Sequence, residues 1–263
     1  MCAQVQILEG GPTLRRTEHW VLMKAAWAAA RLRAPDAVLM ISRRGIRFFS
    51  TNDLAAPAWW LSVTVRDPAA APGRAVIAPA ADFWRALRAT WWRGRGGNHV
   101  TVVPGAVRFE ARGREAEVRG HTIQFEAGDG GIPLGEDEEL ELDADYPTAV
   151  ADVSSTLAAD VAAVAARSDV VELHLARDAQ GWWLAVGGDG EVRRLPARML
   201  LSPPSDAVMG WYPADVVAEL LSLSELADLT VELTEPPERP ALRVGWEGVA
   251  RRARVEAFAA PLG

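Results

Sequence analysis

Acidic side chains are the largest group of residues in this chain whose chemistry could point to a metal or to catalysis. Seven of them cluster near the middle of the sequence: Glu136, Asp137, Glu138, Glu139, Glu141, Asp143 and Asp145. Such a run could bind a hard cation, but it lacks the turn-forming glycine and the ligand spacing of a calcium loop. We therefore interpret it as a solvated acidic segment.

Other reactive residue types do not combine into a catalytic arrangement. The histidines His19, His99, His121 and His174 are scattered, and no two of them have metal-ligand spacing. Cys2 is the only cysteine, which excludes an intrachain disulfide and a thiolate zinc site. The "GGDG" at 187–190 lacks the glycine spacing of a dinucleotide loop. The sequence thus predicts no enzymatic activity, no cofactor and no metal site.

Basic residues show a more regular pattern. Lys24 and Arg31 are seven residues apart in one predicted helix, and Arg85 and Arg88 are three apart in another. Residues three, four or seven apart lie on the same side of a helix, so each pair shares a face.

Charge is unevenly distributed along the chain, whose net charge is −7. Residues 1–125 hold 18 Lys plus Arg against 9 Asp plus Glu, a net of +9, whereas residues 126–263 hold 10 against 26, a net of −16. A basic first half fits an anionic partner, or docking of one half on the other in an oligomer. Uneven surface composition without a partner is the open alternative.

A helix followed by a hairpin is predicted four times. The helical segments are 20–32, 82–92, 153–166 and 213–223. The hairpin strands after them read "DAVLMIS" and "IRFFS", "HVTVV" and "VRFEA", "VVELHLA" and "GWWLAVG", and "LTVELTE" and "ALRVGW". Apolar alternation with a period of two supports the strands. Because each helix is amphipathic, we expect an α+β fold of two similar sheet-rich halves, each with two helices on one face.

A glycine-rich and acidic linker separates the halves. Residues 126–145 read "EAGDGGIPLGEDEELELDAD", a composition that cannot hold a compact core. We expect a first domain at 1–125, a connector at 126–139 and a second domain at 140–263. The chain is 49% hydrophobic but has no apolar run of membrane-spanning length and no signal pattern at its start, so we expect a soluble intracellular protein.

The order of these features resembles a known family. Two halves, four helix–hairpin units, an acidic connector containing "GIP" and a C-terminal "AAP" are similar to DNA sliding clamps of the proliferating cell nuclear antigen family. The resemblance covers essentially the whole chain. It implies the DNA clamp fold, in which three chains join head to tail into a ring around duplex DNA. The helices then line the hole, and the joining edges fall near 115–123 and 191–200.

The resemblance also implies a DNA-contacting surface. The basic channel positions of the family fall on Lys24, Arg31, Arg85 and Arg88. Contacts to phosphates carry no sequence information, so they would let a ring slide, whereas ordinary solvated arginines are the alternative. Trp20 and Trp27 lie on the same stripe as Lys24, and we interpret them as packing residues because a duplex offers no unstacked base.

The second half departs from the family pattern. Its helical segments, "STLAADVAAVAARSD" and "YPADVVAELLSLSELAD", offer alanine, serine and acids where basic channel residues are expected. Arg167 is the one basic residue in them, at a helix end. Three alternatives therefore stay open: a variant ring, a hetero-oligomer, or a clamp in which the DNA contacts mainly one half of each chain.

A client-binding groove is implied under the connector. The matching positions are Ile132, Pro133, Pro240, Phe258, Ala260 and Pro261. Together they would form an exposed apolar patch rimmed by acids, which fits a short client helix with aromatic and aliphatic anchors.

The resemblance leads to a non-enzymatic sliding clamp, a homotrimer that tethers DNA polymerases and repair factors to duplex DNA with the help of a clamp loader. It would act at the nucleoid in a prokaryotic cytoplasm, or in a eukaryotic nucleus, and not at a membrane. A specialised subunit of a hetero-oligomeric checkpoint-type clamp and a protein-only adaptor ring are the alternatives. A metal-dependent enzyme that uses the acidic run is a more distant one.

Overall fold

The computed structural model of the chain describes residues 12–42, 45–52, 58–66, 73–91, 97–124, 147–188, 191–203, 205–224, 229–234, 240–247 and 253–262. Within these residues four α-helices, one short 3₁₀ helix and 17 strands form, and the strands make two antiparallel sheets. The expected sheet-rich α+β class is therefore confirmed.

The four helices form where apolar residues recur at helical spacing. They are α1 (Arg16–Arg31), α2 (Ala80–Ala89), α3 (Thr156–Ala165) and α4 (Ala214–Leu221), and α4 continues into the 3₁₀ helix η1 (Ser222–Ser224). At the start of α1 the backbone N–H of Arg15 donates to the Glu18 carboxylate (2.7 Å), so an acidic side chain satisfies one backbone donor at the helix N-terminus. Phe83, Ala86 and Leu87 of α2 are buried, as its amphipathic pattern predicts.

The strands alternate buried and solvated residues. The first half contributes β1 (Thr13–Leu14), β2 (Ala37–Ser42), β3 (Gly45–Thr51), β4 (Trp59–Arg66), β5 (Arg74–Ala78), β6 (Asn98–Val103), β7 (Ala106–Ala111), β8 (Arg114–Arg119) and β9 (His121–Gln124). The second half contributes β10 (Pro147–Val153), β11 (Val170–Asp178), β12 (Gly181–Gly188), β13 (Glu191–Leu201), β14 (Ala207–Pro213), β15 (Leu229–Thr234), β16 (Leu242–Glu247) and β17 (Ala253–Ala259). All four predicted hairpins are present, as β2–β3, β6–β7, β11–β12 and β15–β16.

Both halves use the same strand-pairing scheme. In the first half β2 pairs with β3 and β5, and β3 pairs with β4. In the second half β11 pairs with β12 and β14, and β12 pairs with β13. The series β1–β6–β7–β8 likewise matches the series β10–β15–β16–β17. The predicted internal repeat therefore holds for the strand pairing within each whole half, and not only for the single hairpins.

A single joint makes the large sheet continuous from one half to the other. Strand β17, the last of the second half, pairs antiparallel with β4 of the first half from Ala253↔Val65 to Ala259↔Trp59. The resulting sheet has the order β14-β11-β12-β13-β10-β15-β16-β17-β4-β3-β2-β5-β9, and β1-β6-β7-β8 form a separate four-stranded sheet.

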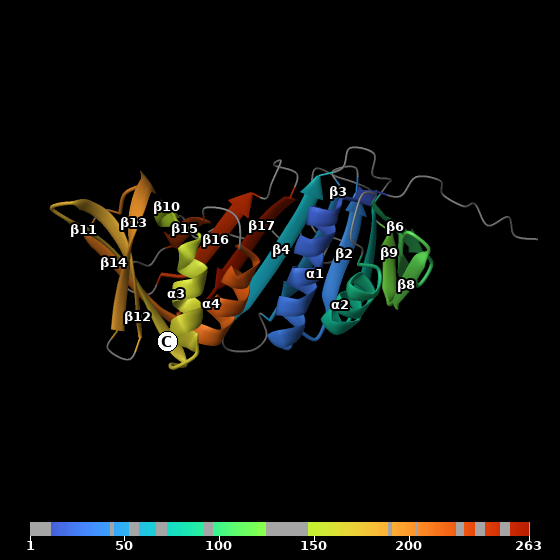
Figure 1. The fold of residues 1–263 in the computed structure, drawn as a ribbon, viewed down its shortest axis with the longest axis horizontal. Helices are drawn as coiled ribbons and strands as arrows, with labels where there is room; N and C mark the ends of the chain where they lie inside the picture. Colours follow the sequence, from blue (N-terminus) through green and yellow to red (C-terminus); the bar gives the residue numbers. More distant parts are fainter. Residues whose placement is uncertain are drawn as a thin grey trace, which may run out of the picture.

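The helices form one layer and the sheets form the other. Figure 1 shows α3, α4, α1 and α2 side by side across one face of the elongated molecule, with the strands behind them. The core lies between the layers; for example, the ring of Phe83 in α2 meets Phe48 in β3 edge-on, with centroids 5.8 Å apart. Such edge-to-face contacts add to the stabilisation that burial itself provides. The solvent side of α1–α4, called the helical face below, is therefore a single surface built from both halves.

Candidate functional site

The four basic residues expected to contact DNA lie on the helical face. Arg31, Arg85 and Arg88 are exposed and Lys24 is half-buried. Lys24 and Arg31 come from α1, and Arg85 and Arg88 come from the neighbouring helix α2. The folded chain therefore brings the two sequence-predicted pairs onto adjacent helices.

Two of these cations are engaged in ion pairs. The Arg31 guanidinium lies 2.8 Å from the carboxylate of Glu219 in α4, and Arg85 lies 2.6 Å from Asp82 in its own helix. Both arginine side chains are more than half exposed, at 57% and 67%, and exposed ion pairs contribute little stability. A phosphate could therefore compete with Asp82 for Arg85 at small cost, whereas the Glu219 side chain is only 18% exposed and would be left partly buried without Arg31.

Four tryptophans on the helical face each carry a cation over the ring. The pairs are Lys24 over Trp20 (5.0 Å), Arg31 over Trp27 (5.8 Å), Arg88 over Trp84 (5.2 Å) and Arg16 over Trp91 (5.6 Å). Cations within about 6 Å of an aromatic ring are attracted by its negative face. Sequence reasoning missed this feature, although three of the pairs are four residues apart, the spacing that stacks side chains on a helix.

A surface cleft lies along the junction of α1 and α2. It has a volume of about 450 Å³ and is lined by Met23, Lys24, Trp27, Trp84, Arg88 and Trp91. The rings of Trp27 and Trp84 face each other across the helix pair, with centroids 4.6 Å apart and planes tilted by 40°. We call it the tryptophan cleft; it combines flat apolar walls with two cations, and no acid lines it.

A buried polar network holds the two helices behind the cleft. His19 of α1 donates its Nε2–H to the carbonyl of Leu87 in α2 (2.7 Å), so its Nδ1 must accept from the amide of Asn98 (2.9 Å). Asn98 also donates to the Thr90 hydroxyl (3.0 Å). Burial lowers the pKa of His19 to about 4, which keeps the ring neutral. The ring of Trp91 packs against His19 at 5.5 Å, so the network also supports one wall of the cleft.

The second half presents a different helical face, as the sequence predicts. Helices α3 and α4, both fully described, contain no lysine or arginine. Asp215 of α4 is exposed, whereas Glu219 is half-buried next to Arg31, and burial raises the pKa of Glu219. Asp160 of α3 is buried and pairs with Arg193 of β13 at 2.9 Å, so it belongs to the packing of helix on sheet. Basic and aromatic side chains on this face are thus concentrated on the first half.

The opposite face of the large sheet carries an apolar cluster. Met40, Phe49, Trp60 and Ala75 are buried there, with Val38, Ile123 and Phe258 packed against them. Phe258, a predicted client-binding residue, stacks on Trp60, with parallel rings whose centroids are 6.0 Å apart. Because side chains alternate along a strand, these residues point away from the helices that cover Leu39 and Phe48. We call this group the outer cluster.

Three further predicted client-binding residues flank the last two strands: Pro240 precedes β16, and Ala260 and Pro261 follow β17. The Pro240 carbonyl accepts a hydrogen bond from the Tyr212 hydroxyl (2.7 Å), and the Ala260 N–H donates to Ala58 (2.9 Å). Pro240 is buried, whereas Phe258, Ala260 and Pro261 are half-buried. This patch is therefore less exposed than its sequence suggests. Ile132 and Pro133, together with the acidic run, lie outside the described residues.

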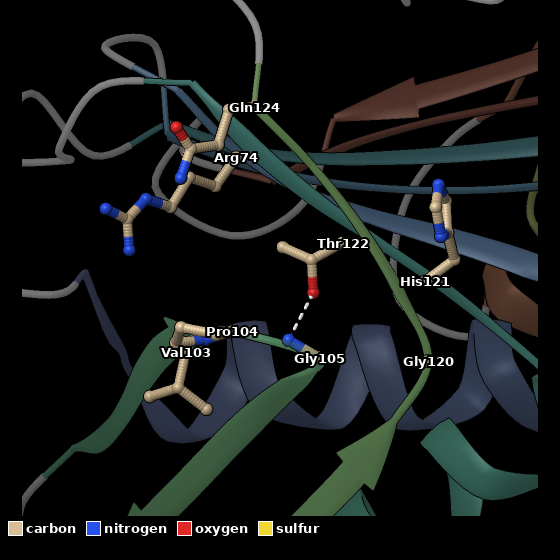
Figure 2. Close-up of a pocket in the computed structure, with 8 residues that line it drawn as sticks. All are labelled: Arg74, Val103, Pro104, Gly105, Gly120, His121, Thr122 and Gln124. Carbon is tan, nitrogen blue, oxygen red and sulfur yellow. Dashed lines mark hydrogen bonds between the residues drawn. The ribbon is translucent and has the colours of Figure 1, made fainter.

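The first predicted joining edge consists of β8 and β9, each an end strand of its sheet. The chain crosses from the small sheet to the large one at Gly120, where a Cβ would collide with the Ile77 carbonyl oxygen. Figure 2 shows this bend beside a cavity of about 470 Å³, with the Thr122 hydroxyl accepting from the Gly105 N–H (2.8 Å). Glycine is therefore required at 120 for the crossing.

The second predicted edge is only partly open. Residues Glu191–Pro196 of β13 pair with β12, while Ala197–Leu201 pair with β10 on the other side of the strand. The prediction of an exposed edge across 191–200 is therefore wrong for its second part, because β10 covers it. Val192, Leu200 and Leu201 are nevertheless 63%, 57% and 44% exposed, which is unusual for large apolar side chains.

No protein-family model and no curated protein matches this sequence. Among the described residues, no group of three or more His, Cys, Asp or Glu is arranged to hold a metal ion. None of the described helices is both long and apolar enough to cross a membrane.

Proposed function

We propose that the chain is a subunit of a DNA sliding clamp, a ring that encircles duplex DNA and holds other proteins on it. The observation that carries this proposal is the repeated half. One pairing scheme occurs twice, and four helices cover one face of a sheet that runs through both halves. The resemblance to the proliferating cell nuclear antigen family, seen in the order of sequence features, supports the same reading.

The joint between the halves suggests how chains would assemble. Within the chain, β17 of one half pairs with β4 of the other. Because the halves are equivalent, β8 corresponds to β17 and β13 corresponds to β4. Strand β8 of one chain would therefore pair with the uncovered part of β13 in the next chain, head to tail, and a joint repeated in this way closes a ring. The exposed Val192 on β13 supports such an interface.

The helical face would then line the hole. Its cations on α1 and α2 suit phosphate contacts without base reading, which lets a ring slide. The acidic residues of α4 would place the DNA toward the first half of each chain. We further propose that the outer cluster around Phe258 is the floor of the groove for polymerases and other clients, on the outside of the ring.

A second candidate is a specialised subunit of a hetero-oligomeric clamp. It is favoured by the absence of lysine and arginine from α3 and α4 and by the ion pair of Arg31 with Glu219. In such a ring the neighbouring subunits would supply the missing basic residues. A ring that binds proteins alone is the remaining alternative.

Mass in solution and retention on DNA test the proposal. Light scattering of the pure protein should give about three times the 28.4 kDa of one chain. Rings reassembled in the presence of nicked circular duplex and then crosslinked should stay on the circle in detergent and leave it once the circle is cut. A stable monomer would favour the hetero-oligomer, and equal loss from intact and cut circles would overturn the clamp.

A further inference from the structure

The tryptophan cleft has no role in sliding along a duplex. The bases of a duplex are stacked on one another, so a sliding ring needs cations and gains nothing from exposed rings. Yet Trp27 is 37% exposed on the helical face, one of few large apolar residues among those described to be so open. Trp84 and Trp91 line the cleft beside it. A surface that needs only charge would not place indole rings there.

We propose that the tryptophan cleft binds unpaired bases of single-stranded DNA, such as the strand that leaves a duplex at a junction. This inference rests on the proposed contact of the helical face with DNA. It adds a second substrate form, single-stranded DNA, to the duplex that the ring would encircle.

The spacing of rings and cations matches the chemistry of a single strand. Each nucleotide carries a flat base and a phosphate, and proteins that bind single strands combine aromatic platforms with a positive groove. The unit of a tryptophan followed four residues later by a cation occurs three times, at Trp20–Lys24, Trp27–Arg31 and Trp84–Arg88. Because each ring has a cation over it, a base that stacked on an indole would take the place of that side chain, and the displaced lysine or arginine would be within reach of the phosphate.

Charge and shape favour a nucleotide over other occupants. The cleft is lined by Lys24 and Arg88 and by no acid, so it selects for an anionic ligand. Its volume of about 450 Å³ is within the usual range for small-ligand sites. An acidic peptide would satisfy the cations but would not supply a flat ring at each step of its chain.

The test compares a labelled 20-nucleotide oligothymidine with a 20-base-pair duplex by fluorescence anisotropy, using the full chain. Replacing Trp27→Ala should weaken oligothymidine binding about five- to a hundredfold, the usual loss for one stacked base, and change duplex binding less than twofold. Trp27→Phe keeps a ring and should restore most of the affinity. Trp211→Ala removes a tryptophan of similar exposure, 41%, from β14 outside the cleft and should have no effect.

The outcomes separate this inference from the clamp proposal. Duplex binding without oligothymidine binding would overturn the cleft and leave the clamp standing. Oligothymidine binding that depends on Trp27, with no duplex binding at all, would support the cleft and overturn the clamp. Equal losses in Trp27→Ala and Trp211→Ala would show that tryptophan is not a base platform here. Circular dichroism of each variant should match that of the parent, since both rings are partly exposed.

Discussion

His19 connects the chemistry of one residue to the geometry of the helical face. Its pKa falls from 6.5 in the unfolded chain to about 4 in the folded one because the ring is buried. The folded state resists protonation, so its stability is complete above pH 6.5 and declines as the pH falls toward 4. Below that value both states are protonated and the loss levels off. The buried network behind the tryptophan cleft should therefore weaken in mild acid.

We predict that the free energy of unfolding falls by about 2 kcal/mol between pH 7 and pH 5 because of His19 alone. Urea denaturation at several pH values measures this. His19→Gln keeps a hydrogen-bonding side chain without a titrating ring, so it should be less stable at pH 7 but show a flatter pH dependence. The same pH dependence in both proteins would assign the effect to other groups.

Of the predicted client-binding residues that the structure describes, Phe258 is the one that lies in the outer cluster. Phe258→Asp would remove the ring that stacks on Trp60 and put a carboxylate on this half-buried surface, and a docked client would have to bury that carboxylate at a cost in free energy. We predict that a helical peptide with aromatic and aliphatic anchors then binds at least about thirtyfold more weakly, as expected for loss of a hot spot. Calorimetry measures the affinity.

A matched variant tests whether charge alone explains that loss. Thr64 of β4 lies outside the outer cluster. It pairs in register with Arg254 of β17, which is four residues before Phe258 on the same strand. Thr64→Asp adds the same charge to a neighbouring position and should leave peptide affinity unchanged. If both variants bind the peptide like the parent, the client groove is elsewhere.

At the scale of elements, the crossing from β8 to β9 depends on Gly120. A side chain there would meet the Ile77 carbonyl oxygen and lie 3.0 Å from the Ala78 Cβ. Gly120→Val should therefore lower the free energy of unfolding by about 1–3 kcal/mol and loosen the edge that would join chains. Denaturation and light scattering report the two effects.

Gly113→Asn is the control for that substitution. Gly113 lies in the turn before β8, with a φ of +76° and open space around its Cβ position. Asparagine tolerates this left-handed conformation, so the change should cost little. An equal loss of stability in both variants would mean that the whole hairpin is sensitive, and not the crossing itself.

The elements that the sequence could predict are those with local signals. Helical spacing in "DFWRALR" and alternation in "VELHLA" predict α2 and β11, and both are present. Strand β4 reads "WWLSVTVR". It is not part of any of the four predicted hairpins, so the sequence does not show which strand it pairs with. Its pairing with β17 joins residues about 190 positions apart, which no local pattern encodes.

The candidate site was partly predictable for the same reason. The faces of Lys24 and Arg88 follow from helix geometry, whereas the ion pair of Arg31 with Glu219 links different halves of the chain. The partnership of Trp27 with Trp84 needs the packing of α1 on α2, which is a tertiary contact. The ordered repeat, by contrast, is visible in the sequence because it recurs.

At the scale of the whole molecule, the halves repeat one fold but differ in charge. The first carries a net of +9 over residues 1–125, and the second carries −16 over the rest. If chains joined head to tail through β8 and β13, each basic helical face would have an acidic one on both sides. Such a channel would attract DNA at three separated places and leave gaps between them, unlike a uniformly basic hole.

This asymmetry predicts where charge removal will matter. Replacing Lys24 and Arg88 by alanine should weaken duplex binding and lower the slope of log affinity against log salt by about 1.8, because each lost phosphate contact contributes about 0.9.

The matched control is the double alanine variant of Arg108 and Arg254, which removes the same charge. Their sequence neighbours Val107 and Val255 are core residues, so these arginines point away from the helical side. Anisotropy titrations from low to physiological salt measure the slopes. If the control lowers the slope as much as the helical variant, duplex DNA is attracted by the net charge of the protein and does not contact the helical face specifically. A ring that binds proteins alone then becomes the better account.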